Sequence, residues 1–304
     1  MPDDLWQRFQ SGDRFALSRL VTQLSRGEES AEVRAALAGH ERRAKVIAVT
    51  GSTGVGKSTL IGRLIELLRE RGRRVAVLAC DPQSPLTGGA LLGDRVRMPA
   101  RPDDPGLFIR SLSATGGSEA VAAHVDHMLS ALSTFGFDVV LLETVGAGQS
   151  DTAVRSLADV VVLLVQPESG DDLQWQKAGL LEVADIVVIH KADLPGAEAA
   201  ERQVQSLLNL PGCREIPVLR VSSGKVSGLD ELWRAIEAVR RNTAPPHENE
   251  RALLRLAQDL LIERYEREAT RVEPLLARWR RHELSDERGA AELLRLLSET
   301  SGTP

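Results

Sequence analysis

The strongest chemical signal in this sequence is one glycine-rich loop. Residues Gly51-Ser52-Thr53-Gly54-Val55-Gly56-Lys57-Ser58-Thr59 contain the pattern G-x-x-x-x-G-K-[ST], between an apolar run of strand length and a segment with helical periodicity. In such a loop, successive backbone N–H groups surround phosphate oxygens at the start of a helix. We therefore expect Lys57 to contact the outer phosphates of a bound nucleotide and Ser58 to ligate Mg²⁺.

Three acidic residues are candidates for holding that metal ion or positioning a water molecule. Asp81 directly follows an apolar run, Asp94 lies in Gly93-Asp94-Arg95, and Glu143 ends another apolar run. Each acid alone is more typical of a solvated turn or a helix cap, but behind a phosphate-binding loop the metal role is favoured. Three residues after Glu143, Gly146 lets a backbone N–H approach the terminal phosphate.

A second set of polar residues indicates a site for a purine base. The run His190-Lys191-Ala192-Asp193 resembles the guanine-binding pattern N-K-x-D. Asp193 would accept hydrogen bonds from the ring N–H and amino group of guanine, while the Lys191 stem packs over the base. His190 replaces the asparagine and supplies only part of its hydrogen bonding, so we expect a weaker guanine preference.

A later run would complete the base site, although the same residues also allow a simpler structural interpretation. Ser222, Ser223 and Gly224 follow the last predicted strand and would contribute backbone N–H groups to the base. The alternative is that His190 is an ordinary loop histidine and that Asp193 caps the next helix.

The elements that must position these residues alternate between strands and helices. Near-continuous apolar runs predict strands buried on both faces, and amphipathic segments between them predict crossover helices. This alternation is typical of an α/β fold with a mostly parallel sheet. The predicted strands are 46–50, 75–80, 139–142, 160–165, 186–189 and 217–221, and the predicted helices are 58–71, 118–132, 173–183, 198–208 and 229–239.

The chain divides into three parts by composition. Residues 1–44 carry apolar positions at helical spacing and predict two or three short helices. Residues 45–243 form the strand and helix alternation, and Pro245-Pro246 then interrupts the pattern. Residues 244–304 are rich in Leu, Arg, Glu and Ala and predict a helical extension.

Composition narrows the classes of function. The 304 residues are 42% hydrophobic and 27% charged, with a formal net charge of −5, which does not favour binding to nucleic acid or a membrane surface through bulk charge. The two cysteines, Cys80 and Cys213, do not make a disulfide framework. Without a predicted signal peptide or membrane span, we expect a cytoplasmic protein.

Together the motifs resemble one family, the methylmalonyl-CoA mutase-associated GTPases of the MeaB, ArgK and MMAA group, within the SIMIBI class of P-loop GTPases. Beyond the phosphate-binding loop, the resemblance rests on four stretches spread over most of the chain. These are Asp81-Pro82-Gln83-Ser84-Pro85-Leu86-Thr87-Gly88-Gly89, Leu92-Gly93-Asp94-Arg95-Val96-Arg97-Met98, Glu143 through Ser150, and Gly170 through Lys177.

The resemblance implies a fold, an activity and partners. The fold would be the P-loop NTPase three-layer sandwich, and the activity slow, Mg²⁺-dependent hydrolysis of GTP to GDP. The partner would be an adenosylcobalamin-dependent acyl-CoA mutase, whose cofactor loading and protection the GTPase would serve as a chaperone. The resemblance also implies a homodimer formed through the C-terminal extension.

The resemblance also implies roles for individual residues. Asp81 and Asp94 would belong to the metal and switch region, and Glu143 would organise the catalytic water, beside Lys57 at the phosphates. Asp171 and Lys177 would lie in a mobile loop that relays the nucleotide state to the mutase. A further departure from the family is Thr53, which stands where proline is common.

Two alternative functions fit the same phosphate-binding loop. A GTPase that inserts nickel into an apo-enzyme normally carries clustered His and Cys, whereas this chain has six His and two Cys far apart in sequence. A nucleotide-dependent protein kinase would need an acceptor pocket, for which the sequence gives no signal. We therefore expect the mutase-associated GTPase.

Overall fold

The computed structural model divides the chain into two compact units, Met1–Asn242 and Thr243–Pro304. The described residues are 2–38, 43–82, 104–114, 124–144, 154–155, 157–167, 178–210, 214–240, 257, 261–262, 264–265 and 267–298.

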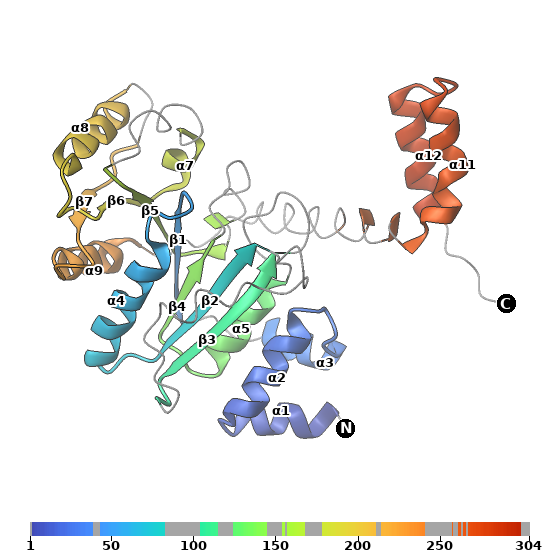
Figure 1. Ribbon diagram of the computed structural model, residues 1–304. Helices are drawn as coiled ribbons and strands as arrows, with labels where there is room; N and C mark the ends of the chain where they lie inside the picture. The colour runs from blue at the N-terminus through green and yellow to red at the C-terminus, as the bar shows by residue number, and fades with distance from the viewer. Residues whose placement is uncertain are drawn as a thin grey trace. The chain divides into compact units, whose positions relative to one another are not determined.

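The first unit is built on a seven-stranded sheet in the order β3-β2-β4-β1-β5-β6-β7 (Figure 1). All paired strands run parallel, so the prediction of a mostly parallel α/β sheet is confirmed. The strands are β1 (Lys45–Gly51), β2 (Val75–Pro82), β3 (Leu107–Ala114), β4 (Val139–Glu143), β5 (Val160–Val165), β6 (Ile186–His190) and β7 (Val218–Val221).

The edge strand β3 was not predicted from the sequence. Its second half alternates apolar and polar residues, and Arg110 donates to the hydroxyl of Thr22 on a neighbouring helix at 3.0 Å. An edge strand has only one strand neighbour, here β2, and tolerates such side chains better than a central strand does. β3 therefore lacks the apolar run that marks the inner strands.

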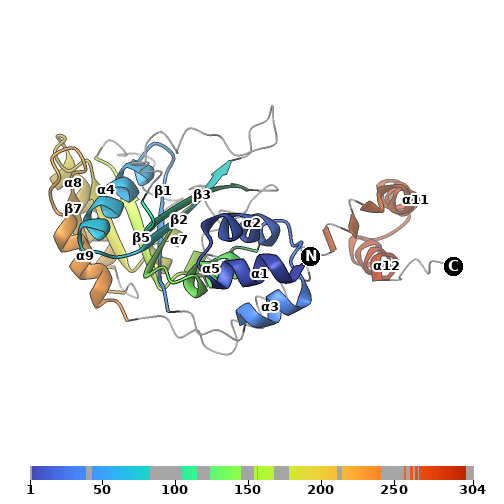
Figure 2. The same ribbon diagram turned by 90° about the horizontal axis from the view of Figure 1, so that it is seen from below.

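Helices cover both faces of the sheet, as Figure 2 shows in the view from below. Successive strand residues point to opposite faces: Ile47 and Val49 join one apolar cluster, whereas Val46 and Ala48 join another. The first cluster packs on α4 (Lys57–Glu70) and α9 (Leu229–Ala238). The opposite face carries α5 (Val125–Thr134), α7 (Ala178–Val183) and α8 (Ala197–Leu208), which completes a three-layer sandwich.

Helix α5 (Val125–Thr134) covers the second half of a predicted helix and extends two residues beyond its predicted end. The sequence pattern predicts a helix over 118–132, but the described helix begins at Val125, after His124 in a left-handed conformation (φ 58°). Residues 118–123 lie outside the described part of the chain.

Three N-terminal helices belong to the same unit as the sheet. They are α1 (Pro2–Gln10), α2 (Arg14–Leu24) and α3 (Ala31–Ala38), and α2 and α3 pack against α5. The Asp13 carboxylate caps α2 by accepting from the backbone N–H groups of Phe15 and Ala16. Apolar residues of α2, including Leu17 and Leu20, are fully buried in the core on that face of the sheet.

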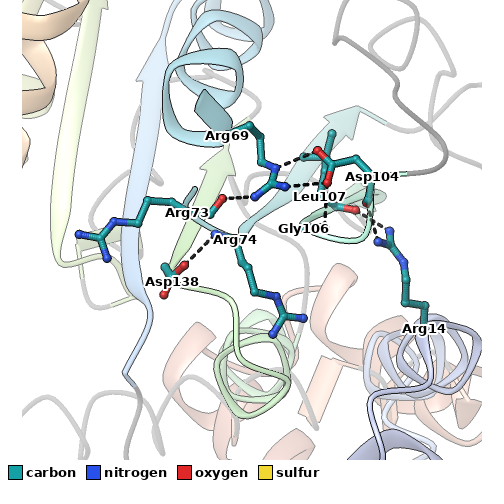
Figure 3. Close-up of polar contacts among 8 residues, drawn as sticks. All are labelled: Arg14, Arg69, Arg73, Arg74, Asp104, Gly106, Leu107 and Asp138. Atoms are coloured by element: carbon teal, nitrogen blue, oxygen red, sulfur yellow. Dashed lines mark hydrogen bonds and ion pairs between the residues drawn. The ribbon is translucent and has the colours of Figure 1, made fainter. Parts of the chain in front are cut away.

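A polar network ties α2 and α4 to the amino-terminal edge of the sheet (Figure 3). Arg69 of α4 makes a bidentate ion pair with the Asp104 carboxylate, with Nη2 at 2.7 Å from Oδ1 and Nε at 2.8 Å from Oδ2. Arg14 of α2 donates to the backbone carbonyl of Asp104 at 2.6 Å. Directly before β2 and β4, the backbone N–H of Arg74 donates to the Asp138 carboxylate at 2.7 Å. This edge fixes where β2, β3 and β4 begin, and thus where their carboxyl ends lie.

The second unit contains a helical hairpin. Helix α11 (Ala269–Arg280) packs on α12 (Asp286–Ser298), and Trp279 Nε1 donates to Asp286 at 2.8 Å. Gly289 lies against the Trp279 ring, since a Cβ there would be 3.2 Å from ring atom Cδ1. The hairpin agrees with the helical character predicted for this region. Across the residues that the structure describes, no helix is long and apolar enough to cross a membrane.

Candidate nucleotide site

The predicted phosphate-binding loop joins β1 to α4 at the carboxyl edge of the sheet. Lys57 is the first residue of α4, and its buried ammonium group donates to the backbone carbonyls of Gly51 at 3.0 Å and Ser52 at 3.3 Å. The lysine therefore spans the loop from its last residues back to its first. Thr59 lies in the first turn of α4.

Gly56 occupies a position that requires glycine for two reasons. Its φ of 101° is a conformation that L side chains rarely adopt. A Cβ at this residue would also lie 2.5 Å from atoms Nδ1 and Cε1 of His190. The loop thus enters α4 with its backbone pressed against the histidine ring.

Ser58 and Glu143 lie side by side beneath the loop. The Ser58 hydroxyl donates to Glu143 Oε1 at 2.7 Å, and both residues are buried, at 7% and 4% exposure. Glu143 is the register partner of Val49, which places it on the strand next to the loop. The adjacent Thr144 donates to the Thr50 hydroxyl at 3.1 Å. Two oxygen groups of the kind that ligate hard metal ions thus meet at the start of α4.

The predicted base-binding segments come together after β6 and β7. Ser222 donates to the Asp193 carboxylate at 2.5 Å, and this hydrogen bond is the main cause that lowers the pKa of Asp193 below its usual value. Lys191, in a left-handed conformation, donates to the side-chain carbonyl of Gln166 at 3.0 Å. The exposed Asp193 carboxylate is therefore an ionised acceptor at neutral pH.

His190 connects these segments to the phosphate-binding loop. Its ring is 2% exposed, with Nδ1 2.8 Å from the backbone carbonyl of Val55 and Nε2 2.7 Å from the Ser223 hydroxyl. Burial lowers the pKa of the ring below its usual value, and this effect outweighs the hydrogen bond to Val55, which acts in the opposite direction.

The structure thus brings three predicted segments to one edge of the sheet: the loop 51–58, the run 190–193 and the serines 222–223, beside Glu143. Gly224 follows in the same turn, which an antiparallel bridge between Ser222 and Ser227 closes. The backbone of Asp81 lies near the end of β2, and its side chain lies outside the described part. The predicted residues Asp94, Gly146, Asp171 and Lys177 also lie outside the described residues.

Sequence reasoning missed Arg63, a second support of the site. From the second turn of α4, its Nε donates to the backbone carbonyl of Ser223 at 3.0 Å. A lone arginine on an amphipathic helix carries no sequence signal for such a contact. In the described part of the chain, no group of three or more His, Cys, Asp or Glu side chains is placed to hold a metal ion.

Comparison with known proteins defines the family. The family model described as methylmalonyl-CoA mutase-associated GTPase MeaB matches residues 17–268, which include the sheet and all of the segments above. The chain belongs to this family. It is therefore a GTPase, and the predicted phosphate-binding loop and the predicted base-binding run lie in the matched region.

Individual relatives agree with the family assignment. A Mycobacterium tuberculosis protein named probable GTPase is 40% identical over 251 residues, which are 79% of this chain and 75% of that protein. GTPase ArgK of Escherichia coli is 38% identical over 197 residues, covering 62% of this chain and 60% of ArgK.

A solved structure supports the fold. The crystal structure titled LAO/AO transport system kinase matches with a TM-score of 0.66 and 24% identity over 98% of each chain. At this identity the likeness concerns the fold alone. It confirms the P-loop NTPase α/β sandwich predicted for this chain.

Proposed function

We propose that this GTPase is a chaperone of an adenosylcobalamin-dependent acyl-CoA mutase, and that its GTP cycle serves cofactor loading and protection of that enzyme. The observation that carries the proposal is the match to the MeaB family model over residues 17–268, and it is supported by the meeting of the predicted phosphate-binding and base-binding segments at the carboxyl edge of the sheet.

Lys57 and the backbone of residues 51–59 are assigned to the phosphates. The Lys57 ammonium already lies among backbone carbonyls of the loop, 3.0 Å from that of Gly51. Phosphate oxygens carry more negative charge than carbonyls and attract the same group more strongly. The backbone N–H groups at the start of α4 add partial positive charge on the same side.

The donors beside the loop fit Mg²⁺. This ion prefers hard oxygen ligands and usually binds through one or two protein oxygens together with phosphates and water. The Ser58 hydroxyl and the Glu143 carboxylate, 2.7 Å apart, are such donors. Mg²⁺ bound there would neutralise charge that develops on the phosphates during hydrolysis. Asp81, Asp94 and the Gly146 N–H complete the assignment, with Glu143 or Asp94 orienting the attacking water.

Asp193 is assigned to guanine. Its exposed, ionised carboxylate can accept from the ring N–H and amino group, two donors that adenine does not present together. The turn at 222–224 and the Lys191 stem border the same space. The segment around Asp171 and Lys177 is assigned to communication with the mutase.

The experiment that tests this function measures GTP hydrolysis by the purified protein alone and with a purified adenosylcobalamin-dependent acyl-CoA mutase, such as a methylmalonyl-CoA or isobutyryl-CoA mutase. We expect the mutase to accelerate phosphate release from GTP and not from ATP. Lys57→Ala should lower nucleotide affinity about tenfold or more, since a charged hydrogen-bond donor is lost.

A matched control is a lysine at the start of β1, the strand that leads into the loop. Lys45 lies at the other end of β1 and donates to the carbonyls of Ile236 and Val239 at the end of α9. Lys45→Ala should lower the unfolding free energy but leave nucleotide affinity intact. Unchanged GTP turnover with every mutase would refute the chaperone role, and accumulation of phosphorylated protein would favour the kinase instead.

A further inference from the structure

The ring of His190 has both of its nitrogens engaged by the protein. Nδ1 lies 2.8 Å from the Val55 carbonyl and Nε2 lies 2.7 Å from the Ser223 hydroxyl, and the ring is 2% exposed. An imidazole has only these two polar atoms. In this arrangement the side chain keeps no polar atom for a nucleotide base.

The partners of the ring determine its tautomer. A backbone carbonyl only accepts, so the Nδ1 next to Val55 must carry the proton. In the neutral ring Nε2 is then an acceptor, and the Ser223 hydroxyl donates to it. The two hydrogen bonds therefore run in one direction, from Ser223 through the ring to the phosphate-binding loop.

The ring also fills the space beside the last glycine of the loop. A Cβ at Gly56 would be 2.5 Å from Nδ1 and Cε1, so the ring edge packs directly on the Gly56 backbone. Val55 and Gly56 are the two residues whose N–H groups precede Lys57. Because this packing is tight, a movement of the ring displaces the backbone where the loop enters α4.

Ser223, the other hydrogen-bond partner of the ring, is itself held by α4. Arg63 of α4 donates to the Ser223 carbonyl at 3.0 Å, while the Ser223 side chain holds the ring. Contacts thus run in a closed circuit from α4 to Ser223, to His190, to Val55 and back into α4. Such a circuit holds its members in one arrangement better than single contacts do.

We propose that His190 is a positioning residue that holds the phosphate-binding loop in shape, and that it does not bind the base. The inference rests on the proposed nucleotide site. It predicts that His190 contributes equally to the binding of every ligand with a phosphate chain, whatever base that ligand carries. Guanine preference then depends on Asp193.

Two amide substitutions separate the two contacts. The amide of asparagine lies near the position of Nδ1, and that of the longer glutamine near the position of Nε2. His190→Asn therefore keeps a donor for the Val55 carbonyl, and His190→Gln keeps an acceptor for Ser223. Of the two contacts, only the one to Val55 reaches the phosphate-binding loop. His190→Asn should therefore retain nucleotide binding, and His190→Gln should weaken it.

The ligands are GDP, ADP and magnesium tripolyphosphate, which has no base, with dissociation constants measured by calorimetry. For His190→Gln we expect all three constants to rise by one common factor of about ten. For His190→Asn we expect the common factor to stay below about three. Asp193→Asn serves as the base-binding comparison and should weaken GDP alone. The exposed His282 of the second unit provides the control His282→Asn, with no change.

The results distinguish this inference from the proposed function. A wild-type protein that prefers GDP to ADP, with His190→Gln weakening GDP alone, would overturn the positioning role and leave the nucleotide site intact. If the wild-type protein bound ADP with the same dissociation constant as GDP, this result would instead contradict the guanine site. Nitrogen-15 NMR of labelled histidine in the wild-type protein needs no variant: a proton on Nδ1 of His190 is expected, and a proton on Nε2 alone would refute the circuit.

Discussion

Protonation of the His190 ring is opposed by its surroundings, which makes this residue a source of pH-dependent stability. Burial lowers its pKa and outweighs the hydrogen bond to Val55, which raises it; the neighbouring Lys191 charge lowers the pKa further, and the Asp193 charge raises it. The remaining ring contacts, Val55 and Ser223, are uncharged. In the unfolded chain the same ring titrates near its ordinary pKa of about 6.5.

We expect this difference to reduce stability in mild acid. Because the folded pKa lies below the unfolded one, the unfolded state takes up the proton first as the pH falls. The stabilisation from the neutral ring is complete above about pH 6.5 and is lost below it, with a slope of at most about 1.4 kcal/mol per pH unit. Denaturant unfolding between pH 7.5 and 5 measures it.

The variant His190→Asn supplies the reference, because asparagine does not titrate. Its unfolding free energy should fall less steeply with decreasing pH than that of the wild type, whereas His282→Asn should follow the wild type. Parallel curves for the wild type and His190→Asn would show that another group is responsible.

Single residues of the site were predictable to the extent that a motif fixes them. The glycine, lysine and serine of the loop are set by the pattern 51–58, and Asp193 by the run that follows β6. The contacts of His190 and Arg63 were not predictable, because they depend on how the loop after β7 approaches α4. That approach is a matter of tertiary packing, which no local spacing encodes.

Among the elements, α2 shows how one helix presents two different surfaces. Leu17 is fully buried in the core with α5, whereas Phe15, two positions earlier, is 63% exposed. Leu17→Ala should lower the unfolding free energy by about 2–5 kcal/mol through a cavity in the core. Phe15→Ala on the same helix should change it by less than about 0.5 kcal/mol.

Chemical denaturation of the two variants against the wild type tests this difference. If Leu17→Ala were as stable as Phe15→Ala, α2 would contribute little to the fold. The sequence predicted helices in 1–44 from the spacing of such leucines, but not that they complete the core of the sheet unit. That integration depends on contacts such as Arg14 to Asp104, residues far apart in the chain.

For the whole molecule, the second unit is where we expect self-association. Its helices leave Leu294 and Trp279 51% and 42% exposed, and a second copy of the chain would remove this apolar surface from water. We expect a homodimer by light scattering and a monomer for Leu294→Asp. Phe15→Asp, at an even more exposed apolar position of the first unit (63%), should remain dimeric. A wild-type monomer at working concentrations would contradict the dimer.

The parallel sheet sets the order in which the site is built during folding. β1 pairs with β4 and β5: Lys45 lies opposite Val139, and Ile47 lies opposite Val160. The two residues of each pair are separated by about a third of the chain. Contacts over such separations form slowly, because long loops must close first. A ribosome must therefore release residue 160 before the strand preceding the phosphate-binding loop has both neighbours. Until then the nascent chain exposes apolar strand edges, and nucleotide can contribute to its stability only after synthesis has passed this point.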